Sequence, residues 1–302
     1  MRPDNHALKA LRKLASPYRV TERGEFRLKH VDPADDGGLG DATKAVAKEL
    51  LDGGVKHLAR LQDVLYAQGR WSLLLVFQAM DAAGKDSAIK HVMSGVNPQG
   101  CQVVSFKAPS HEELLHDWLW RCVKALPERG RIGIFNRSYY EEVLAVRVHP
   151  ELLAAQKNPD ALITKAIWDE RYQDIRGLER HLARNGTVIR KFFLHVSKKE
   201  QRKRFIERLD DPEKHWKFSE SDLDQRACWD EYMDAYEQMV RETASPHAPW
   251  FVVPADNKWY TRMVVAAAIV DALEALDLQC PKPTPEQKKA LEKARKALGD
   301  KG

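Results

Sequence analysis

Hydrophobic residues are distributed along this chain in two patterns. The first is a short continuous apolar run bounded by polar or turn-forming residues, and it occurs five times. Parallel strands that are covered on both faces have this pattern, because neither face needs to be polar. We therefore predict strands over 72–77, 102–106, 132–135, 188–196 and 250–253.

The second pattern is the three- and four-residue spacing of amphipathic helices. In a helix that begins near residue 41, one apolar stripe is made by Leu51, Val55, Leu58, Leu61 and Leu65. Gly53 and Gly54 fall inside this stripe and disfavour a single unbroken helix. Further helical segments are predicted over 84–94, 110–126, 161–184, 198–245 and 259–276, and from 285 to the glycine at 299.

Strands that alternate with helices predict an α/β fold, a three-layer sandwich in which helices cover both faces of a five-stranded parallel sheet. We assign this domain to residues 41–280. Residues 1–40 form an N-terminal extension, with an amphipathic start at Leu8, Leu11 and Leu14. Residues 281–302 form a C-terminal helical tail.

Composition narrows the class of protein. The chain is 43% hydrophobic and 31% charged, as soluble globular proteins are, and no apolar run approaches the ~20 residues of a membrane helix. The first residues lack the apolar centre of a signal peptide, and the four scattered cysteines are typical of reduced cytosolic thiols. We expect a cytoplasmic protein without a membrane partner. Its net charge of +5 permits an anionic substrate.

The run at 73–77 leads directly into small residues, then Gly84-Lys85, then a helix. This is the layout of a phosphate-binding P-loop, in which backbone N–H groups converge on phosphate oxygens and bulky side chains would block the approach. Ala82, Ala83 and Gly84 are small enough for such a loop, and Lys85 would contact the phosphates between which the bond breaks. An ordinary strand–helix turn with a solvated lysine is the alternative.

The loop departs from the usual G-x-x-x-x-G-K-[ST] pattern at two positions. Ala79 stands where the first glycine belongs, and Asp86 where the Mg²⁺-binding hydroxyl belongs, while Ser87 lies one residue too late. Asp81, inside the loop, is our candidate for the missing oxygen ligand of Mg²⁺.

Ligands of open α/β sheets bind at the carboxyl ends of the strands. Lys107 follows the second predicted strand, and Ser110 with Glu113 has the spacing of a capping box. Asn136 and Arg137 follow the third strand, where P-loop enzymes usually carry a metal-binding Asp. These side chains are expected at the same edge of the sheet as the P-loop.

Basic residues are concentrated between 198 and 217. A solvated helix face explains such a run, and so does a lid, over about 198–226, that closes on phosphates and excludes water. Arg204 and Arg208 are four residues apart, so both are predicted to reach one anion, and Lys214 follows them. No base-reading or RNA-binding motif accompanies the run, so nucleic-acid binding is not expected.

Several ordered motifs resemble the polyphosphate kinase 2 family over about residues 18–276. They lie at 78–86, 97–100, 135–142, 211–217 and 249–256. The resemblance implies a fold similar to thymidylate kinase, Mg²⁺ dependence, and reversible phosphoryl transfer between inorganic polyphosphate and adenine nucleotides. Asn136 with Tyr140-Glu141-Glu142 looks like the bifunctional third class, which phosphorylates both AMP and ADP and so makes ATP.

By the same resemblance, the catalytic centre would contain Asp81, Gly84, Lys85, Asn136 and Arg137. Tyr140 and Glu141 would contribute to nucleotide or phosphate binding, and the basic lid residues would contact the transferring phosphates. Two other functions fit the same residues. One is an ATP-dependent nucleoside monophosphate kinase, and the other is a non-catalytic nucleotide-binding regulator. Symmetric homo-oligomers are common among soluble proteins, and we expect one for this chain.

Overall fold

Six strands form one mixed sheet in the computed structural model, which describes residues 13–40 and 44–299. The strand order is β1-β6-β5-β2-β4-β3, and every pairing among β2 to β6 is parallel. The strands are β1 (Arg19–Val20), β2 (Ser72–Gln78), β3 (Cys101–Ser105), β4 (Ile132–Asn136), β5 (Thr187–His195) and β6 (Trp250–Pro254).

The five predicted strands and their parallel arrangement are confirmed, but the predicted strand count is wrong by one. β1 adds an antiparallel edge strand, in which Arg19 and Val20 pair with Phe251 and Trp250 of β6. A two-residue strand is too short to show a period-two pattern in the sequence.

The central strands are buried because they carry apolar side chains on both faces. All residues of β2 and β6 are buried, as are the last seven of β5. Phe77, Phe192 and Phe251 occupy neighbouring register positions on β2, β5 and β6. Their rings stack with centroid separations of 4.8 and 5.6 Å. This aromatic row fixes the register one residue before β2 ends.

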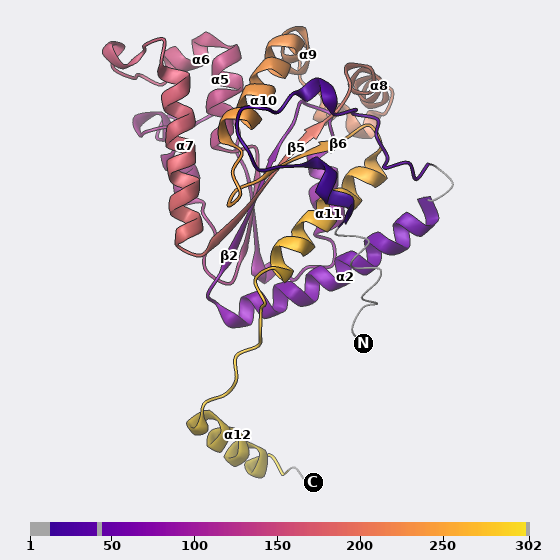
Figure 1. Cartoon of the computed structure of the whole chain (residues 1–302), viewed down its shortest axis with the longest axis vertical. Coiled ribbons are helices and arrows are strands. Elements are labelled where there is room, and N and C mark those ends of the chain that lie inside the picture. Colours follow the sequence, from indigo (N-terminus) through magenta and orange to yellow (C-terminus); the bar gives the residue numbers. More distant parts are fainter. Residues whose placement is uncertain (1–12, 41–43, 300–302) are drawn as a thin grey trace.

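Helices cover both faces of the sheet (Figure 1). One layer contains α2 (Lys44–Gln68), α3 (Lys85–Val92) and α11 (Lys258–Glu274), and the other contains α7 (Ile167–Arg184) and α10 (Trp229–Thr243). The two glycines that disfavour a single unbroken helix do not interrupt the first long helix. α2 continues through Gly53 and Gly54, because its fully buried Leu58 and Leu65 join the core and α2 packs along α11. This burial outweighs the ~1 kcal/mol that each glycine costs a helix.

The region 110–126 does not form the single helix predicted from its capping box. Ser110 and Glu113 do make the reciprocal bonds, at 2.7 and 3.2 Å, but they lead only into the 3₁₀ turn η5 (Glu113–Leu115). Asp117 then accepts a hydrogen bond from the Leu119 backbone N–H, and α4 (Trp120–Lys124) follows. An aspartate that bonds to nearby backbone competes with the helical ladder, so the helix is divided.

The basic region from 198 to 245 is likewise several elements. It contains α8 (Lys198–Leu209), the 3₁₀ helix η8 (Pro212–Lys217), α9 (Ser221–Ala227) and α10. The remaining elements are η1 (Ser16–Tyr18), η2 (Leu28–His30), η4 (Pro98–Gly100), η6 (Tyr139–Val143), α5 (Ala145–Val148), α6 (Pro150–Ala155), η7 (Asp160–Leu162) and α12 (Pro285–Ala297).

The two ends of the chain differ in how they contact the body. Tyr18 donates a hydrogen bond to Asp35 at 2.6 Å and shares one with Tyr260 at 2.9 Å, so the N-terminal segment is tied to α11. Leu14 packs against the core, whereas Leu8 and Leu11 lie outside the described residues. The tail helix α12 lies apart from the body (Figure 1), and residues 279–299 are exposed. No helix within residues 13–40 and 44–299 is long and apolar enough to cross a membrane.

Candidate active site

A cavity of about 890 Å³ opens where the predicted site residues meet at the carboxyl edge of the sheet. The loop after β2, the residues after β3 and β4, and the segment from α8 to α9 all line it. The predicted residues that line it are Asp81, Ala82, Ala83, Gly84, Lys85, Asp86, Ser87, Lys107, Asn136, Arg137, Arg204, Arg208 and Lys214. Sequence segments more than 130 residues apart therefore share one cavity.

The P-loop is a tight turn between β2 and α3. Ala82 and Gly84 both have left-handed backbone conformations, with φ of 62° and 104°. Gly84 precedes the first residue of α3, so the positive φ falls where the chain enters the helix. Glycine adopts this conformation without strain, whereas Ala82 must be held in it by its surroundings.

Arg204 of α8 holds the loop in this shape. Its guanidinium donates to the backbone oxygens of Ala82 and Ala83, at 3.1 and 2.8 Å. It also donates to the backbone oxygens of Ala255 and Asp256, at 2.7 and 2.9 Å, and its Nε donates to Glu200. The side chain is 4% exposed. These five bonds use all five N–H donors of an arginine.

The prediction that Arg204 and Arg208 reach one anion is therefore wrong for this structure. Arg204 is committed to the loop carbonyls, while Arg208 points to the carboxylate of Asp222, with a 3.5 Å separation. Helical spacing placed Arg204 and Arg208 near one face, but it carried no information about the loop carbonyls more than 120 residues earlier in the chain. Gln201, one turn earlier on α8, adds a bond from its amide to the Asp81 backbone oxygen at 3.0 Å.

Lys85, the first residue of α3, is buried at the base of the cavity. Its ammonium donates to the Ala79 backbone oxygen at 2.9 Å. Burial lowers the pKa of Lys85 below its ordinary value, and the nearby Asp81 carboxylate only partly opposes this effect. A bound phosphate would place a negative charge beside the desolvated ammonium and so favour its charged form.

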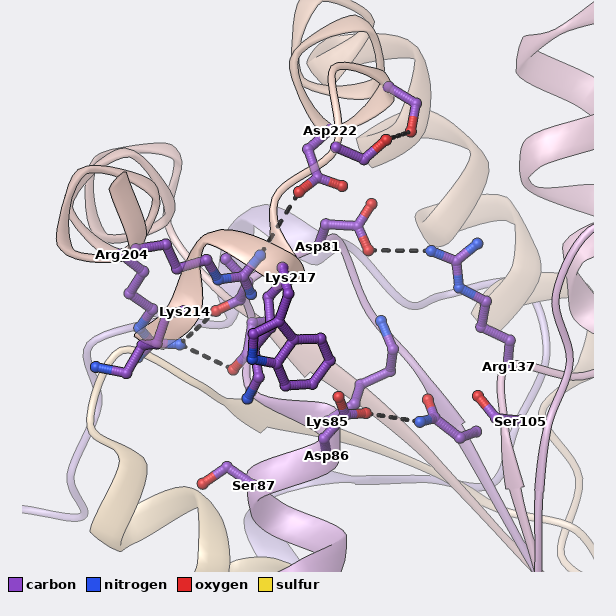
Figure 2. Close-up of a pocket in the computed structure, with 18 of the residues that line it drawn as sticks. Asp81, Lys85, Asp86, Ser87, Ser105, Arg137, Arg204, Lys214, Lys217 and Asp222 are labelled. Carbon is purple, nitrogen blue, oxygen red and sulfur yellow. Dashed lines mark hydrogen bonds and ion pairs between the residues drawn. The ribbon is translucent and has the colours of Figure 1, made fainter. Parts of the chain in front are cut away.

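Asp81 and Arg137 form an ion pair on the cavity wall, with 3.0 Å between Oδ1 and the guanidinium (Figure 2). Arg137 also has a left-handed backbone, with φ of 63°, and its N–H donates to the Phe77 oxygen at the end of β2. Glu141 lies 3.8 Å from the same guanidinium. The charges of Glu141 and Asp81 raise the pKa of Arg137, so it stays cationic.

Two of the three residues that depart from the usual P-loop enzymes, Asn136 and Asp86, contact each other. Asn136 donates from its side-chain amide to the Asp86 carboxylate at 2.7 Å. The Asn136 amide thus donates to the carboxylate of Asp86, the residue that stands where a P-loop usually has a Ser or Thr hydroxyl. Ser87, next along α3, accepts a bond from Arg262 of α11 at 2.9 Å.

The predicted role of Tyr140 in the site is wrong. Its side chain is fully buried and donates to Glu179 of α7 at 2.7 Å, and Lys191 of β5 contacts both of them. The run Tyr140-Glu141-Glu142 lies in the 3₁₀ turn η6, so the Tyr140 side chain faces the core and the Glu141 side chain faces Arg137. Proximity in sequence gave no information about this division.

Several cavity residues were missed by sequence reasoning. They are Ser105, Phe106, Ala108, Glu207, Trp216, Lys217, Ser219, Ser221, Asp222 and Lys258. Ser105 to Ala108 and Lys258 follow strands, so the carboxyl-edge rule was a usable signal for them. Trp216 and Lys217 lie in the motif at 211–217, which was used for the family resemblance but not for the site. Asp222 had no sequence signal.

The donor atoms fit a hydrated Mg²⁺ ion. No cluster of three or more His, Cys, Asp or Glu side chains suited to a metal occurs in the described part of the chain. Mg²⁺ usually needs only one or two carboxylates, because substrate phosphates and water complete its shell. Asp81 Oδ2 is buried without a hydrogen-bond partner, and Asp222 faces the same cavity. Burial and the charge of Asp81 raise the pKa of Asp222. A cation bound near both carboxylates would offset their repulsion and favour the ionised form of Asp222.

A strand–turn–helix loop with a buried lysine, beneath a cavity lined with cations and carboxylates, defines a P-loop phosphotransferase. The pattern of one family, Polyphosphate kinase 2 (PPK2), matches residues 42–281. The chain belongs to that family. The prediction of a P-loop kinase-like α/β fold of this family is thereby confirmed.

Curated relatives and solved structures agree with the family match. An ADP-polyphosphate phosphotransferase of Rhodopseudomonas palustris is 56% identical over 251 residues, covering 83% of this chain and 87% of the relative. An AMP/ADP-polyphosphate phosphotransferase of Meiothermus ruber is 47% identical over 274 residues, covering 91% and 98%. The crystal structure of polyphosphate kinase 2 from Arthrobacter aurescens superposes with a TM-score of 0.83 at 43% identity, covering 92% of this chain and 95% of that one.

Proposed function

We propose that this chain transfers phosphoryl groups between inorganic polyphosphate and adenine nucleotides, converting AMP to ADP and ADP to ATP reversibly. The observation that carries the proposal is the P-loop cavity, in which Lys85, Arg137 and Arg208 face the carboxylates of Asp81 and Asp222. The relatives named for polyphosphate and adenine nucleotides, at 56% and 47% identity, support the donor and acceptor.

The chemistry requires positioning more than acid–base catalysis. A nucleotide phosphate is already ionised near neutral pH, so no strong general base is needed to activate it. Two polyanions must instead be brought in line and their repulsion offset. Lys85 and Arg137 stabilise the charge of the transferring group from one side of the cavity. Lys214 and Lys217, on η8, approach from the other side (Figure 2).

Loop rigidity is the second requirement. The phosphate-binding N–H groups must already point into the cavity when the substrate arrives, because reorganisation during the reaction adds to the barrier. Arg204 and Gln201 bond to backbone oxygens of the loop, at Asp81, Ala82 and Ala83, and so use none of its N–H groups. We assign both to positioning the loop.

Mg²⁺ is part of this proposal. Asp81 would hold it, with Asp222 as the second carboxylate at the cavity. When bound, the ion would supply positive charge that offsets the negative charge of the phosphates. Asp81 also keeps Arg137 in place through the ion pair, so its loss would disturb two cationic centres.

The test is a donor-swap assay on the purified chain. AMP and Mg²⁺ are incubated with polyphosphate in one reaction and with ATP in another, and ADP and ATP are followed by chromatography. Appearance of both ADP and ATP with polyphosphate alone is expected. ADP formed only from ATP would instead identify a nucleoside monophosphate kinase, and no turnover with either donor would identify a non-catalytic nucleotide-binding protein.

A further inference from the structure

Most side chains that line the cavity are charged or polar, whereas a nucleotide base is uncharged and planar. Apart from the small residues of the loop, its wall is made mainly of lysines, arginines, carboxylates and serines. These groups suit phosphates and ribose hydroxyls. A purine base needs a planar apolar surface instead, and a volume of about 890 Å³ is large enough for a whole nucleotide.

Among the described residues, two aromatic side chains line the cavity, Phe106 and Trp216. Phe106 is 6% exposed, and its ring is already engaged by Phe135, edge to face at 4.9 Å, and by the Arg121 guanidinium at 5.6 Å. It has little surface left for a ligand. Trp216 is 79% exposed.

Trp216 lies on the 3₁₀ turn η8, which hydrogen bonds fix at its start. Asp211 accepts a bond from the Glu213 N–H at 3.1 Å, and His215 bonds to the Leu209 oxygen at 2.8 Å, so η8 is joined to the end of α8. Within the part of the chain that the structure describes, the indole has no aromatic stacking partner. The ammonium of Lys217 lies 5.0 Å from its centroid.

Trp216 is an exposed aromatic side chain at the cavity, and its ring has room for a ligand to stack on it. Indole prefers to stack on another aromatic plane, and a nucleotide base offers one. Trp216 lies between Lys214 and Lys217, and all three line the cavity. One short turn therefore presents an exposed indole flanked by two lysines that line the cavity.

We propose that Trp216 stacks on the base of the acceptor nucleotide and is the residue by which this enzyme distinguishes a nucleotide from a bare phosphate chain. The proposal rests on the function proposed above and adds the base-binding subsite to it. Polyphosphate lacks a base, so Trp216 contributes to nucleotide affinity and not to polyphosphate affinity.

The test measures equilibrium binding by calorimetry, with Mg²⁺ present and without turnover. ADP and inorganic pyrophosphate are the two probes, because they share a diphosphate and differ in the nucleoside. Trp216→Ala is expected to weaken ADP binding about 10-fold, as the loss of one stacked base predicts, and to leave pyrophosphate binding unchanged. Trp216→Phe, which keeps an aromatic plane, should restore most of the ADP affinity.

Leu223→Ala is the matched control, because Leu223 is an exposed apolar side chain, 52% exposed on α9, that does not line the cavity. It should bind both probes like wild type. Unchanged ADP binding in Trp216→Ala would overturn the proposal. Equal weakening of ADP and pyrophosphate would also overturn it, since Trp216 would then act through the shape of η8.

The two proposals fail in distinguishable ways. ADP binding is measured without polyphosphate, so a wrong phosphoryl donor would leave the calorimetric result intact. A wild-type chain that binds pyrophosphate but shows no preference for ADP would overturn the base-binding role of Trp216 while leaving polyphosphate chemistry open to the donor-swap assay.

Discussion

Lys85 is a cation that the fold has largely removed from water. Burial lowers its pKa, and its ammonium is bonded only to the Ala79 backbone oxygen among the polar contacts of the described chain. Phosphate binding needs the charged form. In the free enzyme, therefore, this charge is lost at a lower pH than from an ordinary lysine.

A pH profile tests this placement of Lys85. The alkaline limb of kcat/KM reports the free enzyme and should fall below the ordinary lysine pKa of about 10.5. Bound phosphate favours the charged ammonium and raises the pKa again, so the alkaline limb of kcat should lie at higher pH. Lys85→Arg keeps its charge over this range, and whatever activity it retains should lack the limb. Coincident limbs for kcat and kcat/KM would contradict the assignment.

The hydrogen bond between Asn136 and Asp86 can be tested by swapping the two side chains between the two positions. Asn136→Asp would place two carboxylates where the 2.7 Å hydrogen bond now lies, and we expect about a 10-fold loss in kcat/KM at neutral pH. Adding Asp86→Asn restores one donor and one acceptor and should recover most of the loss. Steady-state kinetics of the single and double variants measure this coupling, and purely additive losses would show that the bond is unimportant.

The sequence predicted the site residues that directly follow the predicted strands. Asp81, Lys85 and Arg137 follow directly from the strand–turn–helix pattern and from the rule that parallel strands end at one edge. Arg204 was placed at the cavity but given the wrong role, because its partners lie 121 and 122 residues away. Tyr140 was misplaced because a 3₁₀ turn reverses which neighbours face the core.

At the scale of elements, α8 and the P-loop behave as one unit. Arg204 joins the loop to α8 and to the chain after β6, which makes the loop shape depend on three segments. Movement of α8 would therefore change the loop itself. This explains why a basic helix beside the site need not contribute all of its charges to the substrate.

Arg204→Lys tests this coupling, since lysine keeps the charge but cannot satisfy four carbonyl oxygens. We expect kcat to fall about 10- to 100-fold, the range associated with small misplacements of catalytic groups, and hydrogen exchange at the loop to rise. Arg202→Lys is the control, because Arg202 is exposed on the same helix. Unchanged exchange at the loop in Arg204→Lys would argue against a positioning role.

Strands were predicted better than helices. Short apolar runs between turn-forming residues were a sufficient signal, and all five predicted strands were found, although β3 at the edge of the sheet has no buried residue. The single helix predicted over 110–126 is divided because Asp117 bonds to local backbone, whereas α2 stays unbroken because packing on α11 outweighs its two glycines. The first outcome has a local cause, a side chain that bonds to backbone two residues away. The second shows that helix propensity is weaker than the contacts that a distant segment supplies.

At the scale of the whole molecule, the chain has one core and a tail outside it. The last side chains packed against the core are near Leu276 and Leu278, and residues 279–299 are exposed. A chain that ends after residue 280 should keep the wild-type Tm in a thermal unfolding scan. Ending the chain after residue 270 would remove the fully buried Ala272 and Leu273 and should lower the Tm by several degrees. A large loss of Tm in the first truncation would show that α12 docks on the body.

The most direct test of the central claim is ATP synthesis from ADP and polyphosphate, followed by phosphorus NMR, in wild type and Lys85→Ala. Loss of a buried cation should leave folding intact, which the Tm verifies, and should abolish transfer. We expect polyphosphate-dependent ATP from wild type and none above background from the variant. Equal rates from the two proteins would contradict the assignment of phosphoryl transfer to the P-loop cavity.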